Sequence, residues 1–246
     1  MTRTWTETRA AIEGVDGWLT ADQARRLYAV AAGCPPGGRI VEIGSFRGRS
    51  TIVLASAAPD DVEVVAIDPH AGTDRGPREI AGHEHEARAD RDAFERNLAT
   101  AGVAGRVRHV AALSADAHSL ADGPIDVLYV DGAHRYGPAR ADLRDWGARV
   151  QDGGTLLVHD AFSSFGVTLA ILRELVAGRR FRYTGRTRSL AEYRADLRGR
   201  TRLGNAARQL LQLPWFARNL ALKVLLTMGW GKLLERLGRP TPEWPY

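Results

Sequence analysis

Residues 39–51 read Arg-Ile-Val-Glu-Ile-Gly-Ser-Phe-Arg-Gly-Arg-Ser-Thr, and this stretch decides the fold. The short apolar run at 39–43 predicts a buried β-strand. Gly44 and Gly48 then indicate a turn, and residues 49–58 have a helical pattern. Glycines let the backbone approach a ligand closely, and the helix N-terminus offers unpaired N–H groups. The stretch therefore predicts a strand, a ligand-binding turn and a helix.

The same alternation of short apolar runs and helical patterns continues along the chain. We predict further strands at residues 62–67, 106–110, 125–130 and 155–158, and helices at 21–32, 90–101, 138–150 and 167–177. A long loop is expected at 70–89, and 180–183 and 188–193 are expected to form an antiparallel pair around Thr184-Gly185. This alternation predicts an α/β fold with a mainly parallel sheet.

The composition excludes several classes of protein. With 44% hydrophobic and 26% charged residues among 246, the chain is neither disordered nor fibrous. Cys34 is the only cysteine, which excludes an internal disulfide and a cysteine zinc cage. The N-terminus lacks the apolar segment of a secretory signal, and no apolar run is long enough to span a membrane. We therefore expect a cytoplasmic protein.

The net charge of +5 conceals a strong asymmetry. Residues 1–178 hold 19 Lys and Arg against 25 Asp and Glu, a net of −6, whereas residues 179–246 hold 15 against 4, a net of +11. Such a basic segment is typical of a nucleic-acid, membrane or acidic-partner contact, and equally of a solvated helical face.

Three acidic residues each follow a predicted strand: Asp68, Asp131 and Asp160. Since the carboxyl ends of parallel strands meet at one edge of a sheet, we expect the three carboxylates to converge. An acid in the position of Asp68 commonly binds ribose hydroxyls. Asp131 and Asp160 can share a hard cation such as Mg²⁺, and His134 is close enough to act as a general base.

Four motifs together resemble the class I S-adenosylmethionine-dependent methyltransferases. The resemblance is strongest to the branch with macrocin-type sugar O-methyltransferases and catechol O-methyltransferase-like enzymes, and it covers roughly residues 20–193. The motifs are Val41-Glu-Ile-Gly-Ser-x-x-Gly-x-Ser50, Ile125-Asp-x-Leu-x-x-Asp-Gly-x-His-x-Tyr136, Asp142-Leu-x-x-Trp146 and Gly153-Gly-x-x-x-x-His-Asp160.

The resemblance implies a Rossmann-like, doubly wound sheet of seven strands with an antiparallel final strand. It also implies S-adenosylmethionine as cofactor, a divalent cation held by Asp131 and Asp160, and catalytic roles for His134 and Asp131. The implied cofactor-binding residues are Glu42, Gly44, Ser45, Gly48, Ser50, Asp68, Ser114 and Asp131, with Asp68 at the ribose and Ser114 near the adenine. Ala161 stands where catechol-type enzymes have Asn, which leaves the number of metal ligands open.

The expected organisation is a methyltransferase domain with an N-terminal helical cap at residues 1–195, followed by a basic amphipathic helical tail at 196–246. Within the tail, residues 203–237 interleave Leu, Trp and Phe with Arg and Lys, and Pro214 should split them into short helices. Their apolar face either packs on the domain or a second subunit, or lies in a membrane interface.

The expected activity is methyl transfer to a hydroxyl of a sugar or other small molecule, including a lipid-linked glycan if the tail contacts the inner face of a membrane. The alternative is a non-catalytic protein of the same fold that binds a membrane or a partner. The four-residue spacing of Gly44 and Gly48 disfavours a nicotinamide-dependent oxidoreductase. A nucleic-acid substrate is not expected, because no Asn/Asp-Pro-Pro-Tyr/Phe element is present.

Overall fold

A computed structural model describes residues 2–72, 84–197 and 201–228. Its centre is one seven-stranded sheet with the strand order β3-β2-β1-β4-β5-β7-β6. β7 runs antiparallel to both β5 and β6, and the other paired strands are parallel. The strands are β1 (Arg39–Ile43), β2 (Glu63–Ile67), β3 (Val107–Val110), β4 (Ile125–Val130), β5 (Val150–Val158), β6 (Arg182–Thr187) and β7 (Leu190–Arg194). The predicted sheet with one reversed strand is therefore confirmed.

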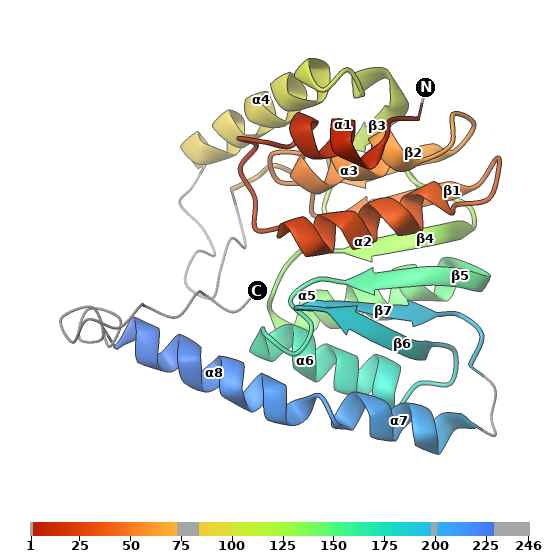
Figure 1. Ribbon diagram of the computed structural model, residues 1–246, viewed down its shortest axis with the longest axis vertical. Coiled ribbons are helices and arrows are strands. Elements are labelled where there is room, and N and C mark those ends of the chain that lie inside the picture. Colours follow the sequence, from red (N-terminus) through yellow and green to blue (C-terminus); the bar gives the residue numbers. More distant parts are fainter. Residues whose placement is uncertain (1, 73–83, 198–200, 229–246) are drawn as a thin grey trace.

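Helices cover both faces of this sheet (Figure 1). α1 to α4 pack with the side chains of one face, including Ile40, whereas α5 and α6 pack with those of the other, including Val41. This alternation explains why the strand sequences are apolar throughout. The α-helices are α1 (Trp5–Ala11), α2 (Ala21–Ala32), α3 (Arg49–Ala57), α4 (Glu84–Thr100), α5 (Tyr136–Ala141), α6 (Phe165–Ile171), α7 (Arg202–Leu210) and α8 (Leu213–Thr227).

Two of the predicted helices change geometry along their length. After α5 the chain forms a π-helical turn, η2 (Asp142–Trp146), and a 3₁₀ turn, η3 (Gly147–Arg149). α6 likewise continues into a π-helical turn, η4 (Leu172–Val176), and a further 3₁₀ turn, η1 (Ala104–Arg106), precedes β3. The helices predicted at 138–150 and 167–177 are thus present as composite segments.

Several predicted boundaries were wrong for local reasons. α4 begins at Glu84, so residues 84–89 are helical, and the rest of the loop predicted at 70–89 lies partly outside the described residues. β5 begins at Val150 because the Gly-Gly segment pairs with the end of β7: Gly153 N–H donates to Ala195 O. The turn between β6 and β7 lies at Arg188, which adopts φ 53°, and Gly185 forms a bulge inside β6.

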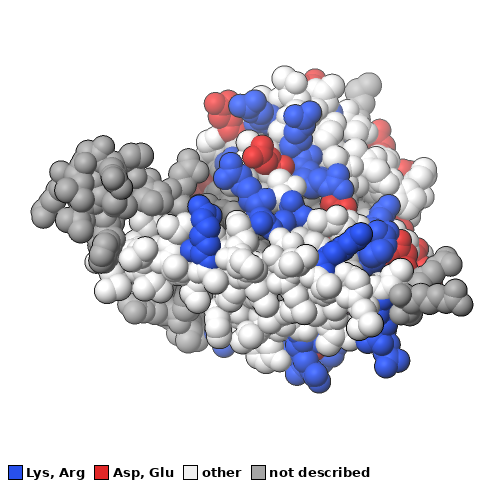
Figure 2. Space-filling view, turned by 60° about the horizontal axis from the view of Figure 1, so that its bottom comes forward, with Lys and Arg blue, Asp and Glu red and all other residues white. Residues whose placement is uncertain are grey.

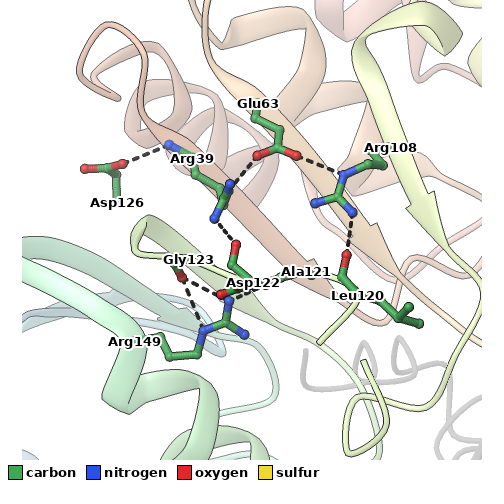
Figure 3. A network of polar contacts seen from close by, with 9 residues as sticks. All are labelled: Arg39, Glu63, Arg108, Leu120, Ala121, Asp122, Gly123, Asp126 and Arg149. Atoms are coloured by element: carbon green, nitrogen blue, oxygen red, sulfur yellow. Dashed lines mark hydrogen bonds and ion pairs between the residues drawn. The ribbon is translucent and has the colours of Figure 1, made fainter. Parts of the chain in front are cut away.

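The amino edge of the sheet is held by a network of arginines (Figure 3). Glu63 accepts from Arg39 Nε at 2.6 Å and from Arg108 Nε at 2.8 Å, which joins β1, β2 and β3. Arg108 and Arg149 also donate to backbone carbonyls of the segment that enters β4, those of Leu120 and Gly123. These contacts fix the strands from the end that lies opposite the predicted site.

The tail continues from the sheet as α7 and α8, which run along α6 and the β6 edge (Figure 1). The predicted break at Pro214 is confirmed, since Pro214 lies in the first turn of α8. The last part of the predicted helical tail, residues 229–237, lies outside the described residues. No helix in the described ranges is long and apolar enough to cross a membrane. The division into units 1–195 and 196–246 stays a prediction.

Candidate active site

A cavity of about 390 Å³ opens at the carboxyl edge of the sheet, next to the adjacent strands β1 and β4. Ligands of doubly wound sheets bind at this kind of position, where the strand order reverses. Predicted residues that line the cavity are Gly44, Ser45, Ser50, Asp68, Ser114, Asp131 and His134. Glu42, Gly48 and Asp160 are not among its lining residues.

The turn after β1 requires glycine at two positions, for different reasons. Gly44 has φ 86°, and a Cβ there would lie 2.2 Å from the carbonyl oxygen of Asp131. This close approach brings the ends of β1 and β4 together beneath the cavity. Gly48 has φ 87°, and a Cβ there would lie 2.6 Å from Leu98 Cδ1. Gly48 therefore permits close packing of the α3 N-terminus on α4.

Glu42 is fully buried beneath this turn. The hydroxyls of Ser50 and Thr51 donate to its two carboxylate oxygens, each at 2.5 Å, and so fix the first turn of α3. Burial raises the pKa of Glu42 to about 7, although these hydroxyl donors partly oppose the shift. The observed contacts give Glu42 a structural role, and its direct contact with a cofactor stays a prediction.

Asp68 joins the loops that follow β1 and β2. Its Oδ2 accepts from the N–H groups of Ser45 and Phe46, and its Oδ1 accepts from the N–H of His70, all at 2.8 Å. A carboxylate has about four lone-pair sites, so one remains for a ligand hydroxyl. The structure thus leaves room for the predicted ribose contact and adds a role in shaping the cavity.

Ser114 lines another part of the cavity, in the segment between β3 and β4. Its hydroxyl donates to Asp142 Oδ1 at 2.5 Å, and its carbonyl accepts from Trp146 Nε1 at 3.1 Å. Burial raises the pKa of Asp142 to about 6. The proposed place of Ser114 near the adenine is untested.

Two acids and two histidines meet at the ends of β4 and β5. His159 Nδ1 lies 3.1 Å from Asp131 Oδ1 and 3.8 Å from Asp160 Oδ2. His134 Nε2 lies 2.9 Å from Asp160 Oδ2. The hydroxyl of Tyr129 donates to Asp131 Oδ2 at 2.8 Å and so orients this carboxylate. These distances bring Asp131, Asp160 and His134 into one cluster. Asp68, the third carboxylate that was expected to converge, is not part of this cluster and lines the cavity instead, as Asp131 does.

The charges in this cluster shift one another strongly. Burial disfavours a charged imidazole at His159, but the carboxylates of Asp131 and Asp160 outweigh it and raise the pKa to about 10. For His134, burial is likewise outweighed by Asp160, so its pKa also rises. Burial would raise the pKa of Asp160, but the two histidines hold it well below the usual range. His159 is therefore protonated near neutral pH and balances the charge of the two acids.

The cluster also fits a divalent cation. One ligand atom each of Asp131, His134 and Asp160 lie within 4.8 Å of one another. Asp160 Oδ1 is buried and has no hydrogen-bond partner among the described residues, whereas His134 Nε2 contacts the other oxygen of the same carboxylate. Carboxylate oxygens and imidazole nitrogens are common ligands of Mg²⁺, Mn²⁺ and Zn²⁺. The unsatisfied oxygen of Asp160 is an atom that a bound cation would engage.

The sequence did not reveal the whole cavity wall. The segment between α1 and α2 reaches the cavity, where the ring of Trp18 lies 5.1 Å from that of Phe46. Trp18 and Leu113 are each 54% exposed and give the wall an apolar part. Neither position carries a local sequence signal, because only the packing of α1 and α2 brings residue 18 to the turn after β1.

Comparison with known proteins relates this chain to methyltransferases. Residues 41–161 match a family described as a methyltransferase domain. The chain is 30% identical over 149 residues to a catechol O-methyltransferase of Mycobacterium tuberculosis, a match that covers 60% of this chain and 59% of that relative. The chain thus spans less than two thirds of the length of this relative.

Solved O-methyltransferase structures share the fold. TomG of Streptomyces achromogenes, in complex with S-adenosylmethionine, is 21% identical with a TM-score of 0.53, covering 80% of this chain and 92% of that one. A Bacillus cereus O-methyltransferase with S-adenosylhomocysteine is 19% identical with a TM-score of 0.52, covering 77% and 87%. NovP is 19% identical with a TM-score of 0.57, covering 78% and 88%. At these identities the likeness supports the fold.

Proposed function

We propose that this chain, whose residues 41–161 belong to the methyltransferase-domain family, transfers a methyl group from S-adenosylmethionine to a hydroxyl of a small molecule. One observation carries the proposal. Asp131 and His134 line the same cavity as the glycine turn, and both also belong to the cluster that contains Asp160. The turn proposed to bind the cofactor and the side chains proposed to activate the acceptor thus line one cavity.

S-adenosylmethionine supplies a sulfonium methyl group, and a divalent cation supplies Lewis acidity that lowers the pKa of an acceptor hydroxyl. The chain would hold the cation with Asp131 and Asp160. It would hold the cofactor with the turn at Gly44 and Ser45 and with Asp68. The walls of the cavity orient the two reactants for an in-line displacement and limit access of water.

His134 is proposed to take the hydroxyl proton. Its Nε2 lies 2.9 Å from Asp160 Oδ2, so this carboxylate stabilises the imidazolium that forms. The oxygen then forms a bond to the methyl carbon, the carbon–sulfur bond breaks, and its electron pair stays on sulfur. The same pairing with Asp160 outweighs the effect of burial and raises the pKa of His134, so the imidazole holds the accepted proton more firmly than a free histidine would.

The proposed acceptor carries the hydroxyl on a sugar, a polyol or a catechol. A sugar or polyol hydroxyl follows from the resemblance to macrocin-type enzymes, and the relative named as a catechol O-methyltransferase makes catechols the second candidate. The apolar wall formed by Trp18 and Leu113 suits an acceptor with a hydrophobic part, such as an aromatic ring or a lipid-linked glycan.

Formation of S-adenosylhomocysteine with a panel of catechols, sugars and polyols tests the proposal. Turnover should fall by at least 100-fold in Asp160→Asn and His134→Ala. Asp152→Asn is the matched control. Asp152 lies near the start of β5, whereas Asp160 follows the end of this strand, and the Asp152 side chain is 97% exposed. Full turnover after chelation by EDTA would remove the cation from the proposal. Tight S-adenosylhomocysteine binding without turnover on any acceptor would favour the non-catalytic alternative.

A further inference from the structure

The helices α7 and α8 turn polar side chains toward the rest of the protein. Asn205 is buried and accepts from the N–H of Tyr183 at 2.7 Å while donating to the carbonyl of Phe181 at 3.1 Å. Gln209 is also buried and donates to the carbonyl of Leu175 at 3.5 Å. These amides satisfy backbone groups at the open edge of β6 and at the end of η4.

The inner side of α8 also presents polar side chains to the rest of the protein. Asn219 donates to the carbonyl of Phe162 at 3.3 Å, and Lys223 Nζ lies 3.0 Å from the carbonyl and 3.1 Å from the hydroxyl of Ser163. Two aromatic side chains, Trp215 and Phe216, pack against the core between these polar contacts. Both helices are therefore docked largely through polar groups.

The outward sides of the two helices are apolar instead. We call the following exposed residues the outer apolar face: Leu203, Leu210, Leu211, Leu220, Val224, Leu225 and Met228, which are between 39% and 88% exposed. Along α8 the helical spacing places Val224 and Leu225 on the side away from Asn219 and Lys223, with Leu220 on the flank between the two sides. A surface helix in water normally has the reverse arrangement, with its apolar stripe toward the core. An exposed apolar surface of this kind marks a contact site.

The charge around this face is of one sign. No Asp or Glu occurs between Asp196 and Glu235. Arg208 and Arg218 are exposed, and no ion pair joins either of them to an acid within the described part of the chain. Figure 2 brings these helices forward and shows a broad area without charged side chains in its lower half, bordered by Lys and Arg, with acidic groups mostly above it and at its right edge.

We propose that the outer apolar face lies on an anionic lipid surface. Leucine side chains would enter the boundary between headgroups and acyl chains, and Arg208 and Arg218 would meet lipid phosphates. A two-fold pairing of this face with a second copy would instead bring arginines together without acidic partners. Since no described helix can cross a membrane, the contact would be peripheral.

Binding of the full chain to vesicles tests this proposal independently of turnover. Flotation with vesicles of phosphatidylcholine mixed with phosphatidylglycerol should recover the protein, and vesicles of phosphatidylcholine alone should recover much less. Binding should weaken as salt rises, because exposed charges are screened.

Two pairs of variants separate the contributions. Arg208→Gln with Arg218→Gln should weaken binding by about fivefold for each arginine. The control, Arg9→Gln with Arg96→Gln, removes the same charge from exposed positions on α1 and α4 and should bind as the wild type does. Leu211→Gln with Val224→Gln should also weaken binding, whereas Leu120→Gln, at a 55% exposed leucine outside this face, should not.

Either of two results in the vesicle assays overturns the proposal. One is equal recovery with neutral and anionic vesicles, or no recovery with either. The other is equal loss of binding in the control variants, which would indicate a non-specific charge effect. A dimer in sedimentation analysis that dissociates in Leu211→Gln with Val224→Gln, together with no vesicle binding, would assign the face to a second copy.

Discussion

Removal of the Asp68 carboxylate should have two separable effects, on stability and on cofactor binding. Asp68→Ala leaves the N–H groups of Ser45, Phe46 and His70 without their acceptor, each from a bond of 2.8 Å. The Asp68 side chain is 17% exposed, so water can reach part of this site. At about 1 kcal/mol for each bond, the free energy of unfolding should fall by roughly 3 kcal/mol without any ligand.

Urea unfolding of the ligand-free protein measures the first effect, and calorimetry with S-adenosylhomocysteine measures the second. Loss of a ribose contact should weaken binding by about 1–3 kcal/mol, which is roughly 5- to 150-fold. Asp61→Ala is the control, because Asp61 accepts from a single backbone N–H, that of Gly37, at an exposed site. Equal unfolding of the two variants would refute the loop-joining role. Normal ligand affinity in a destabilised Asp68→Ala would refute the ribose role.

Three further predictions concern glycine, burial and the cation. Gly44→Ala should lower the free energy of unfolding by at least about 3 kcal/mol, because its Cβ would overlap the Asp131 carbonyl. Gly14→Ala, at φ 77° with open space around it, should cost only about 1 kcal/mol. Equal shifts of the melting temperature in the two variants would contradict this prediction. Because burial raises the pKa of Glu42 from 4.5 to about 7, its protonated form stabilises the fold below pH 4.5, and this contribution is lost as the pH rises through 7. Glu42→Gln should therefore gain stability relative to the wild type, by about 3 kcal/mol between pH 4.5 and 8, and a pH-independent difference in urea unfolding would argue against it. Calorimetry with Mn²⁺ should show tighter binding at pH 8.5 than at pH 6, since His159 holds a proton that opposes a cation, and an unchanged affinity would exclude that competition.

The sequence was sufficient to predict the central strands and the place of the site. Apolar runs end at Asp68 and Asp131, and parallel strands necessarily bring such residues to one edge. The contacts of these residues could not be predicted, because they depend on side-chain geometry. Asp68 binds backbone N–H groups of the neighbouring loop, and His159, which follows the last residue of β5, lies between the two acids.

The errors also have physical causes. The turn between β6 and β7 was predicted at Thr184-Gly185 because glycine favours turns, but Gly185 serves a bulge and Arg188 takes the left-handed conformation. The start of α1 carries a clear helix signal in the sequence, a capping box formed by Thr4 and Glu7. The apolar residues of the tail were expected either to pack on the domain or a second subunit, or to lie in a membrane interface. Trp215 and Phe216 do pack against the core, but the buried positions of α7 and α8 are amides that bond to backbone groups, which the sequence pattern did not indicate.

The contacts of Asn219 and Lys223 have a consequence for how the molecule unfolds. They hold the carbonyls of Phe162 and Ser163 directly after Asp160, in a segment where Asp160 and Phe162 adopt φ 53° and 55°. A chain shortened to residue 195 would leave this strained segment without those donors. We therefore expect α8 and the end of β5 to exchange amide hydrogens as one cooperative unit. Opening of α8 would then expose the backbone beside Asp160 to solvent as well.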